Sequence, residues 1–453
     1  MRITPDDILN GPTAPVLRRM TIPMVWGIAA MFLFQMVDLY FIGLLGTQEL
    51  AAISFTFPVT FTIISLAIGI TIALSITVGK AIGAGRKNTA ARIATNAIIA
   101  GIIVVAVIAV VGLSTVDALF TLLGASPATI ALIHEYIDLW YLYCVFLVVP
   151  YIGNSAIRAT GDTFWPSLLM ISSGVVNIVL DPLLIFGIGP FPEMGIRGAA
   201  VATVIAWIVT FLGSLWLLGI REKLLLIAVP NVRTFIDDTW QLFKLGAPIS
   251  LANMAVPLGV AVLTKFVSTH GEAAVAAFGT GSRIESMAMV VSFALTAALS
   301  PYMAQNFGAS NSTKAREALG IALRFGFVFQ LIVYLVLVVL SGWVGHIFSD
   351  DPVVIDNVAL YLWIMPLGGA FYALFIVYNT AFNASGRSGL TLLGTVVRLV
   401  VLVIPLAWIG QRLFGLTGIF GGVVIGNALS ALFSVWLFRR YLNTQVDGSP
   451  APT

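Results

Sequence analysis

The chain has 453 residues, of which 59% are apolar and 9% are charged, and its formal net charge is +3. An ordinary soluble domain carries roughly 25% charged residues, so this composition excludes a water-soluble globular protein and indicates an integral membrane protein. The small net charge gives no reason to expect nucleic acid as a partner, and one cysteine, Cys144, excludes an intrachain disulfide framework.

Long apolar stretches follow one another along the chain and predict transmembrane helices, because each can cross about 30 Å of hydrocarbon. Strands of a membrane barrel would instead alternate in polarity over about ten residues. The first stretch is too long for the apolar part of a signal peptide, so we expect it to remain in the mature protein. Gly, Pro and charged residues separate twelve predicted spans, at 14–41, 52–79, 90–116, 127–152, 163–188, 196–219, 239–265, 274–304, 315–341, 353–380, 389–411 and 417–439.

Basic residues give the predicted orientation, because short loops rich in Lys and Arg stay on the cytoplasmic side of a membrane. With the N-terminus placed inside, 19 of the 23 Lys and Arg residues fall on inner loops or inner helix halves. The outer side keeps Arg197, Lys265, Arg283 and Arg412. We therefore expect a multi-pass protein of the plasma membrane, which is the inner membrane in bacteria, with both termini in the cytoplasm.

An internal duplication relates the two halves of the chain. Residues typical of turns and kinks recur at a constant shift of 225 positions for about 140 residues, and the shift then becomes 220. Six spans per copy predict two parallel lobes related by an axis along the membrane normal. These are an N-terminal lobe at 1–219, a cytoplasmic linker at 220–238, and a C-terminal lobe with a short cytoplasmic tail at 239–453. The matched pairs include Pro23 with Pro248, Gly83 with Gly308, Tyr136 with Tyr361, Gly195 with Gly415 and Gly198 with Gly418.

Two aspartates lie inside predicted spans with apolar residues on both sides, Asp38 in MFLFQMVDLYFIGLLG and Asp181 in VVNIVLDPLLIFG. A carboxylate at membrane depth costs at least about 2.5 kcal/mol and usually handles an ion or a proton. Under the duplication, Asp38 corresponds to Leu263 and Asp181 to the stretch 404–408, so the second copy lacks these charges. A structural role common to both copies would have left polar residues in both, so the asymmetry favours a functional site.

The spacing around Asp181 indicates an ion site. Asn177 precedes Asp181 by four residues, so both side chains project from one face of a helix. If Asp38 approaches Asp181, the two carboxyl groups titrate as a coupled unit and form a proton relay. The same oxygens, with Asn154 and Thr203, also suit Na⁺, which prefers several oxygen ligands. Asn154 equally suits a hydrogen bond between helices, and the sequence leaves both questions open.

Several motifs resemble the MATE multidrug exporters, over essentially the whole chain from 17 to 440. They are GLLGTQELAAIS after the first span, RATGDT and NASGRS at the ends of the fourth and tenth spans, and NIVLDP in the fifth. The resemblance implies export of cationic or amphipathic drugs in exchange for H⁺ or Na⁺. Its DinF-like branch implies coupling residues in the N-terminal lobe, matched here by Asp38, Asn154, Asn177 and Asp181. It also implies a hinge at Pro23, where the first helix bends when Asp38 is protonated. The NorM-like branch carries acidic residues in the seventh and tenth spans, whereas here the seventh span and the core of the tenth, YLWIMPLGGAFYALFIVY, have none.

Other side chains inside the spans receive weaker interpretations. Arg283 and Glu285 lie two residues apart, so they face different directions, and we interpret them as structural or gating groups of the outer half. Arg324 and Arg398 are expected to snorkel or to pair near the cytoplasmic side. Aromatic and Met side chains can form an adaptable apolar surface for flat cations. The candidates for this substrate cavity are Phe34, Tyr136, Met170, Trp207, Met254 and Met287.

Taken in order, the predicted elements give an all-α membrane protein with twelve transmembrane helices in two six-helix lobes around a central cavity. This architecture suits an alternating-access transporter, and we expect a proton-coupled multidrug antiporter. The alternatives are a Na⁺-coupled exporter and a lipid or oligosaccharide flippase of the same superfamily, which would need a cluster of Arg and Lys inside a lobe. An enzyme is not expected, because His134, His270 and His346 stand singly and no nucleophile motif occurs. We expect a monomer in the lipid bilayer, no cofactor besides the coupling ion, no structural metal and no nucleic acid partner.

Overall fold

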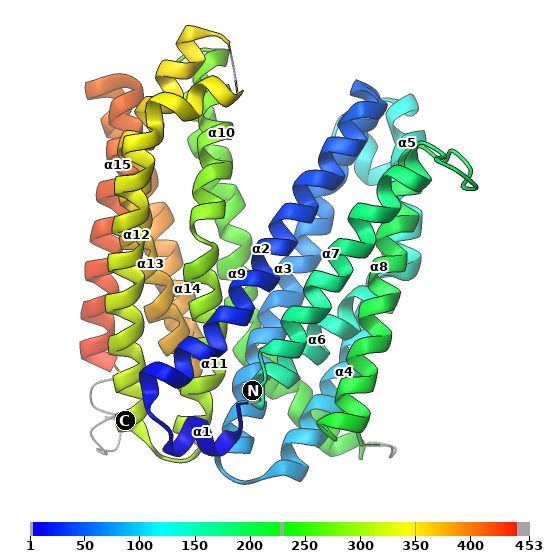
Figure 1. The fold of residues 1–453 in the computed structure, drawn as a ribbon, viewed down its shortest axis with the longest axis vertical. Helices are drawn as coiled ribbons and strands as arrows, with labels where there is room; N and C mark the ends of the chain where they lie inside the picture. The colour runs from blue at the N-terminus through cyan, green and yellow to red at the C-terminus, as the bar shows by residue number, and fades with distance from the viewer. Residues whose placement is uncertain (1–2, 227–230, 349, 442–453) are drawn as a thin grey trace. The chain divides into compact units, whose positions relative to one another are not determined.

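A computed structural model describes residues 3–226, 231–348 and 350–441, and within these ranges the chain forms helices joined by short turns and contains no strand (Figure 1). The first half consists of α1 (Pro5–Asn10), α2 (Thr13–Leu45), α3 (Thr47–Gly83), α4 (Lys87–Leu122), α5 (Pro127–Tyr143), α6 (Val145–Ala159), α7 (Phe164–Ile185), α8 (Ile196–Trp216) and the π-helical η1 (Leu217–Arg221). The second half consists of α9 (Val232–Ser268), α10 (Glu272–Ala288), α11 (Val290–Gly308), α12 (Ser312–Phe348), α13 (Pro352–Ser385), α14 (Ser388–Val396), the π-helical η2 (Val397–Val403) and α15 (Ile404–Tyr441).

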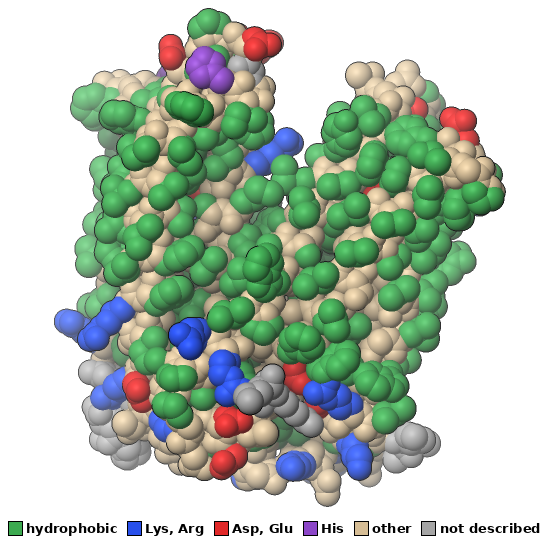
Figure 2. Space-filling model, in the orientation of Figure 1, with side chains coloured by type: hydrophobic (Ala, Val, Ile, Leu, Met, Phe, Trp, Pro, Cys, Tyr) green, Lys and Arg blue, Asp and Glu red, His purple; other side chains and the backbone are tan. Residues whose placement is uncertain are grey.

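The number of membrane-crossing helices agrees with the sequence. Nine helical segments of the described chain are long and apolar enough to cross, and the bent pairs α5–α6 and α10–α11 bring the number to eleven. The segment Ser388–Tyr441 counts once, although Phe414 and Gly415 leave the helical conformation and divide it into two parts. Each part can cross about 30 Å of hydrocarbon, so the fold is the predicted all-α fold with twelve transmembrane helices. Hydrophobic side chains cover the flanks of these helices (Figure 2).

Two of the predicted spans, 127–152 and 274–304, are broken rather than continuous. Helices α5 and α6 meet at 48° at Cys144, and α10 and α11 meet at 42° at Met289. Both junction residues have ψ angles near zero, −17° for Cys144 and −8° for Met289, so the backbone tightens toward 3₁₀ geometry there. Neither junction residue is Pro or Gly, the residues that usually signal such a break in a sequence.

The helices group into two compact units. Unit 1 contains Ile22–Lys244, and unit 2 contains Asp6–Thr21 together with the chain from Leu245 onward. Helix α2 therefore begins in unit 2 and continues in unit 1, whereas α9 begins in unit 1 and continues in unit 2. The predicted linker, 220–238, lies within the range of unit 1, and its residues 227–230 lie outside the described residues.

The duplication is visible in backbone geometry. Gly195 has φ 53° and ψ −135°, and its match Gly415 has φ 59° and ψ −136°. Residues with a side chain rarely adopt this conformation, so glycine is required at both turns. Three residues on, a Cβ atom at Gly198 or at Gly418 would clash with a backbone carbonyl oxygen of the preceding helix. The same tight turn thus joins the last two spans of each half.

A shift of 225 residues also relates two contacts at the starts of α9 and α2. In unit 1, Asp238 of α9 accepts hydrogen bonds from Arg92 of α4, at 3.0 Å from Nε and 3.2 Å from Nη2, and from Asn96 Nδ2 at 2.8 Å. In unit 2, Thr13 Oγ1 of α2 donates to Glu317 Oε2 of α12 at 2.7 Å. Positions 92 and 317 are 225 apart, and so are positions 13 and 238. The starts of α2 and α9, which belong to a different unit from the rest of each helix, are therefore hydrogen-bonded at equivalent positions.

We predict that Asp238→Asn lowers the free energy of unfolding by about 1–3 kcal/mol, because the amide cannot accept both bonds of the Arg92 guanidinium. The measurement is thermal unfolding of the purified protein in detergent. Asp237→Asn is the matched control, since Asp237 is the exposed neighbour on the same turn. Equal melting temperatures for the two variants would contradict a stabilising role for the Arg92–Asp238 pair.

Candidate functional site

Asp38 of α2 and Asp181 of α7 meet inside unit 1, where their carboxyl groups lie within hydrogen-bonding reach of each other. Asp181 is fully buried, at 0% exposure. Among the described residues, no N–H or O–H group is directed at Asp38 Oδ1 or at Asp181 Oδ2. An ionised carboxylate accepts hydrogen bonds and donates none. A hydrogen bond between the two groups therefore requires that one of them carry a proton.

Asn177 links this pair to the next helix. It lies one turn before Asp181 on α7, and its Nδ2 donates both to Asp181 Oδ1 and to Thr203 Oγ1 of α8, each at 3.3 Å. The Asn177 side chain is buried, and its Oδ1 has no donor within the described part of the chain. The structure thus brings together four of the five residues predicted for ion coupling, Asp38, Asn177, Asp181 and Thr203.

Asn154, the fifth predicted coupling residue, lies on α6. It is buried, and its Oδ1 likewise lacks a donor among the described residues. In that part of the chain, no hydrogen bond connects Asn154 to Asp181, Asn177 or Thr203. Its neighbour Ser155 donates to the carbonyl of Thr71, which ties α6 to α3. A coupling role for Asn154 stays a prediction.

Tyr136 of α5 stands close enough to Asp38 and to Asp181 to interact electrostatically with both. The sequence placed Tyr136 among the substrate-cavity candidates and not at the ion site. Its match at Tyr361 in the duplication is the signal that could have set it apart, since few large polar residues recur between the two halves. The carboxyl pair is therefore bordered by a phenol as well as by the amide of Asn177.

The other five substrate-cavity candidates are distributed over both units. In unit 1, Phe34 packs over Gly174, where an added Cβ would lie 3.5 Å from Phe34 Cβ, and Trp207 contacts Trp140 edge-on with 5.8 Å between ring centroids. Trp140 is buried, so Trp207 belongs to packing inside this unit. Met170 is partly buried on α7, Met254 is partly buried on α9 and Met287 is exposed on α10. Contact of these residues with a substrate stays a prediction.

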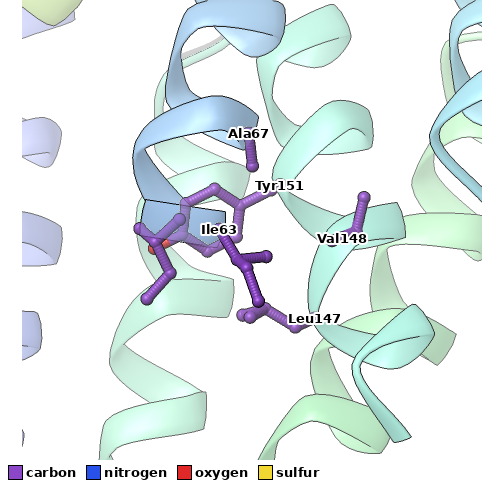
Figure 3. A pocket seen from close by; sticks show the side chains of 6 residues that line it. Ile63, Ala67, Leu147, Val148 and Tyr151 are labelled. Carbon is purple, nitrogen blue, oxygen red and sulfur yellow. The ribbon is translucent and has the colours of Figure 1, made fainter. Parts of the chain in front are cut away.

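A small apolar pocket opens between α3 and α6 in unit 1 (Figure 3). It is lined by Ile63, Ile64, Ala67, Leu147, Val148 and Tyr151. No carboxylate or basic group lines it. Its chemistry suits packing of aliphatic groups and does not suit ion binding.

In unit 2 the equivalent positions of the two aspartates are apolar. Leu263, which matches Asp38, and Ala407, in the stretch matched to Asp181, belong to one buried hydrophobic cluster. Tyr361, the match of Tyr136, belongs to the same cluster. The duplication therefore brings equivalent positions together in both units, and the positions that carry Asp38 and Asp181 in unit 1 are apolar in unit 2.

Charged residues of unit 2 occupy other positions. Tyr361 donates to Glu285 Oε2 of α10 at 2.6 Å, and Arg398 Nη1 of η2 donates to Asn427 Oδ1 of α15 at 2.9 Å. The sequence suggested that Arg398 either snorkels or pairs, and at 7% exposure it is buried and has a partner within the unit. The reason is local, because its guanidinium packs over the rings of Tyr372 and Phe375 inside the unit.

Comparison with known proteins gives the chain its family. The MatE family model matches twice, at residues 23–183 and 248–409, and the two matches begin 225 positions apart. The FAD transporter of Shewanella oneidensis is 37% identical over 433 residues, covering 96% of each chain. The multidrug export protein MepA of Staphylococcus aureus is 25% identical over 451 residues, covering 97% of each chain.

Solved structures agree with these relatives. The MATE transporter VcmN of Vibrio cholerae, as an Asp-to-Asn mutant, superposes with a TM-score of 0.91 and 31% identity, covering 94% of this chain and 96% of its own. The same transporter in its bent form gives a TM-score of 0.89 over the same shares. With the family model matching both halves, the chain belongs to the MATE family of membrane transporters and is not an enzyme.

Proposed function

We propose that this protein exports small organic molecules in exchange for protons, and that Asp38 and Asp181 form the coupling site. The observation that best supports the proposal is the approach of their carboxyl groups, since a bound proton would let one group donate a hydrogen bond to the other. Loss of that proton would leave two negative charges close together in a poorly screened environment, where charge repulsion is strong. The deprotonated and protonated forms would therefore favour different arrangements of α2 and α7, which is what ion coupling needs.

Sodium is the alternative coupling ion. A Na⁺ site would use the oxygens of Asp38 and Asp181 with Asn177 Oδ1 and Thr203 Oγ1, since a hard cation takes several oxygen ligands. The approach of the two carboxyl groups favours the proton, because a single proton shared between them would join them by a hydrogen bond. We take the proton as the coupling ion for this reason.

We further propose that both termini face the cytoplasm of a bacterial inner membrane and that the protein works as a monomer. The orientation is supported by the Lys and Arg side chains, which gather mostly near one end of each unit (Figure 2). Pro23 is proposed as the hinge of α2. The chain passes from unit 2 to unit 1 between Thr21 and Ile22, directly before Pro23, and a proline inside a helix removes one backbone hydrogen bond.

The substrate has two candidate classes. A site with carboxylates favours cationic or amphipathic drugs, and the relative in Staphylococcus aureus is named as a multidrug exporter. The more similar relative, 37% identical, is named as a FAD transporter, which favours a flavin dinucleotide as a second candidate. A lipid or oligosaccharide flippase is less supported, since the described residues include one buried Arg and no buried Lys, and not a basic cluster.

Transport in proteoliposomes tests the coupling ion. With the purified protein, a pH gradient imposed without Na⁺ is expected to drive uptake of ethidium or FAD against its concentration gradient. A Na⁺ gradient at equal pH is expected to drive none, because the carboxyl pair exchanges protons. Uptake that follows the Na⁺ gradient and ignores the pH gradient would assign the site to Na⁺ instead.

Substitutions test the site itself. Asp38→Asn and Asp181→Asn are each expected to lower gradient-driven transport at least tenfold, because an amide cannot take up and release the coupling proton. The matched control is Asp117→Asn, which neutralises an exposed carboxylate of the same unit. Membrane insertion and thermal unfolding should be unchanged in all three variants. Full transport by both site variants would exclude the coupling role.

A further inference from the structure

Arg398 is a buried cation with too few partners. Its guanidinium has five N–H donors, and the described residues provide one hydrogen bond, from Nη1 to Asn427 Oδ1 at 2.9 Å. Nε is buried without an acceptor in the described part of the chain. A charged group held at membrane depth is costly and usually marks a functional site. The N–H donors of Arg398 that have no acceptor could therefore bind an anion.

Glu285 does not provide that anion. Its carboxylate interacts electrostatically with Arg398 across the unit, yet no ion pair within 4.0 Å joins them among the described residues. Glu285 Oε2 instead accepts the hydrogen bond of the Tyr361 hydroxyl at 2.6 Å. The Arg398 guanidinium thus keeps its capacity for a second acceptor that comes from outside the chain.

The surroundings of Arg398 suit a planar, phosphorylated ligand. The ring centroids of Tyr372 and Phe375 lie 4.5 and 5.2 Å from Arg398 Cζ, and both residues come from neighbouring turns of α13. Arginine binds phosphate through two parallel N–H bonds, and its planar group stacks on aromatic rings. Arg398 also lies in the π-helical η2, a form of helix that is frequent at functional sites.

We propose that Arg398 is the anion-recognition residue of unit 2, where it binds a phosphate group while the partly exposed ring of Tyr372 offers aromatic surface to a ring-bearing substrate. The inference rests on the proposed export function and deepens its second candidate, a flavin dinucleotide. A phosphate can come from the cargo or from a lipid headgroup. The two sources share the chemistry that Arg398 recognises, and the experiment separates them.

The test compares binding of FAD and riboflavin to the purified full-length protein in phosphatidylcholine nanodiscs. Riboflavin carries the flavin ring and no phosphate. Arg398→Gln is expected to weaken FAD binding at least tenfold and to change riboflavin binding less than twofold, with Arg398→Lys in between because it keeps the charge and loses the paired donors. Arg324→Gln, which removes an exposed Arg from α12 of the same unit, is the matched control and should leave both affinities unchanged.

Wild-type protein provides a second measurement that does not depend on how the variants fold. Inorganic pyrophosphate should compete with FAD and not with riboflavin. Adding phosphatidylglycerol to the nanodiscs should weaken FAD binding only if the phosphate of an anionic lipid headgroup also reaches Arg398, and Arg398→Gln should then abolish that effect. Unchanged FAD binding in Arg398→Gln, equal loss of FAD and riboflavin binding, or no competition by pyrophosphate would overturn the inference. Binding of FAD without transport in proteoliposomes would count against the export function and leave the anion site standing.

Discussion

The interior of a bilayer provides no water, so every polar group that enters it must find a partner within the protein. A helix pairs its own backbone N–H and C=O groups by hydrogen bonds. This constraint accounts for a chain that is helical through nearly all of its described length. Side chains that break the rule then stand out clearly. Among the described residues, no donor reaches one oxygen of Asp38 or one of Asp181, and no acceptor reaches the buried Nε–H of Arg398. Each marks a place where stability gives way to another requirement.

Because the two halves are duplicated, equivalent positions of unit 1 and unit 2 can be compared within one molecule. Both units bring the same positions together, with Tyr136 beside Asp38 and Asp181 in unit 1, and Tyr361 beside Leu263 in the hydrophobic cluster of unit 2. Tyr361 then donates its hydroxyl to Glu285, a carboxylate whose match in the first half, Thr60, is uncharged. One framework therefore holds two different distributions of charge, and the difference lies in side chains and not in the fold.

The sequence was sufficient to predict the transmembrane spans and the side chains that share a helix face, because both follow from composition and residue spacing. Apolar stretches between Gly, Pro and charged residues located the spans to within about seven residues, and the four-residue spacing of Asn177 and Asp181 predicted their common face. The bends at Cys144 and Met289 could not be predicted, because they arise from a few ψ angles and carry no Pro or Gly. The contact of Tyr361 with Glu285 and the burial of Arg398 depend on which helices pack together, and no local pattern records that packing.

Ion and cargo need not share one site for transport to be coupled. Coupling requires that each ligand bind one conformation of the protein better than the other, and the resulting free energy acts equally in both directions. A proton shared by the two carboxyl groups of unit 1, as we propose, would meet this requirement, since its loss would increase the repulsion between α2 and α7. An anion bound at Arg398 would meet it separately, since it competes with the electrostatic pull of Glu285 on the same guanidinium. In both proposals the common physical step would be the neutralisation of a buried charge, by a proton in unit 1 and by a phosphate in unit 2.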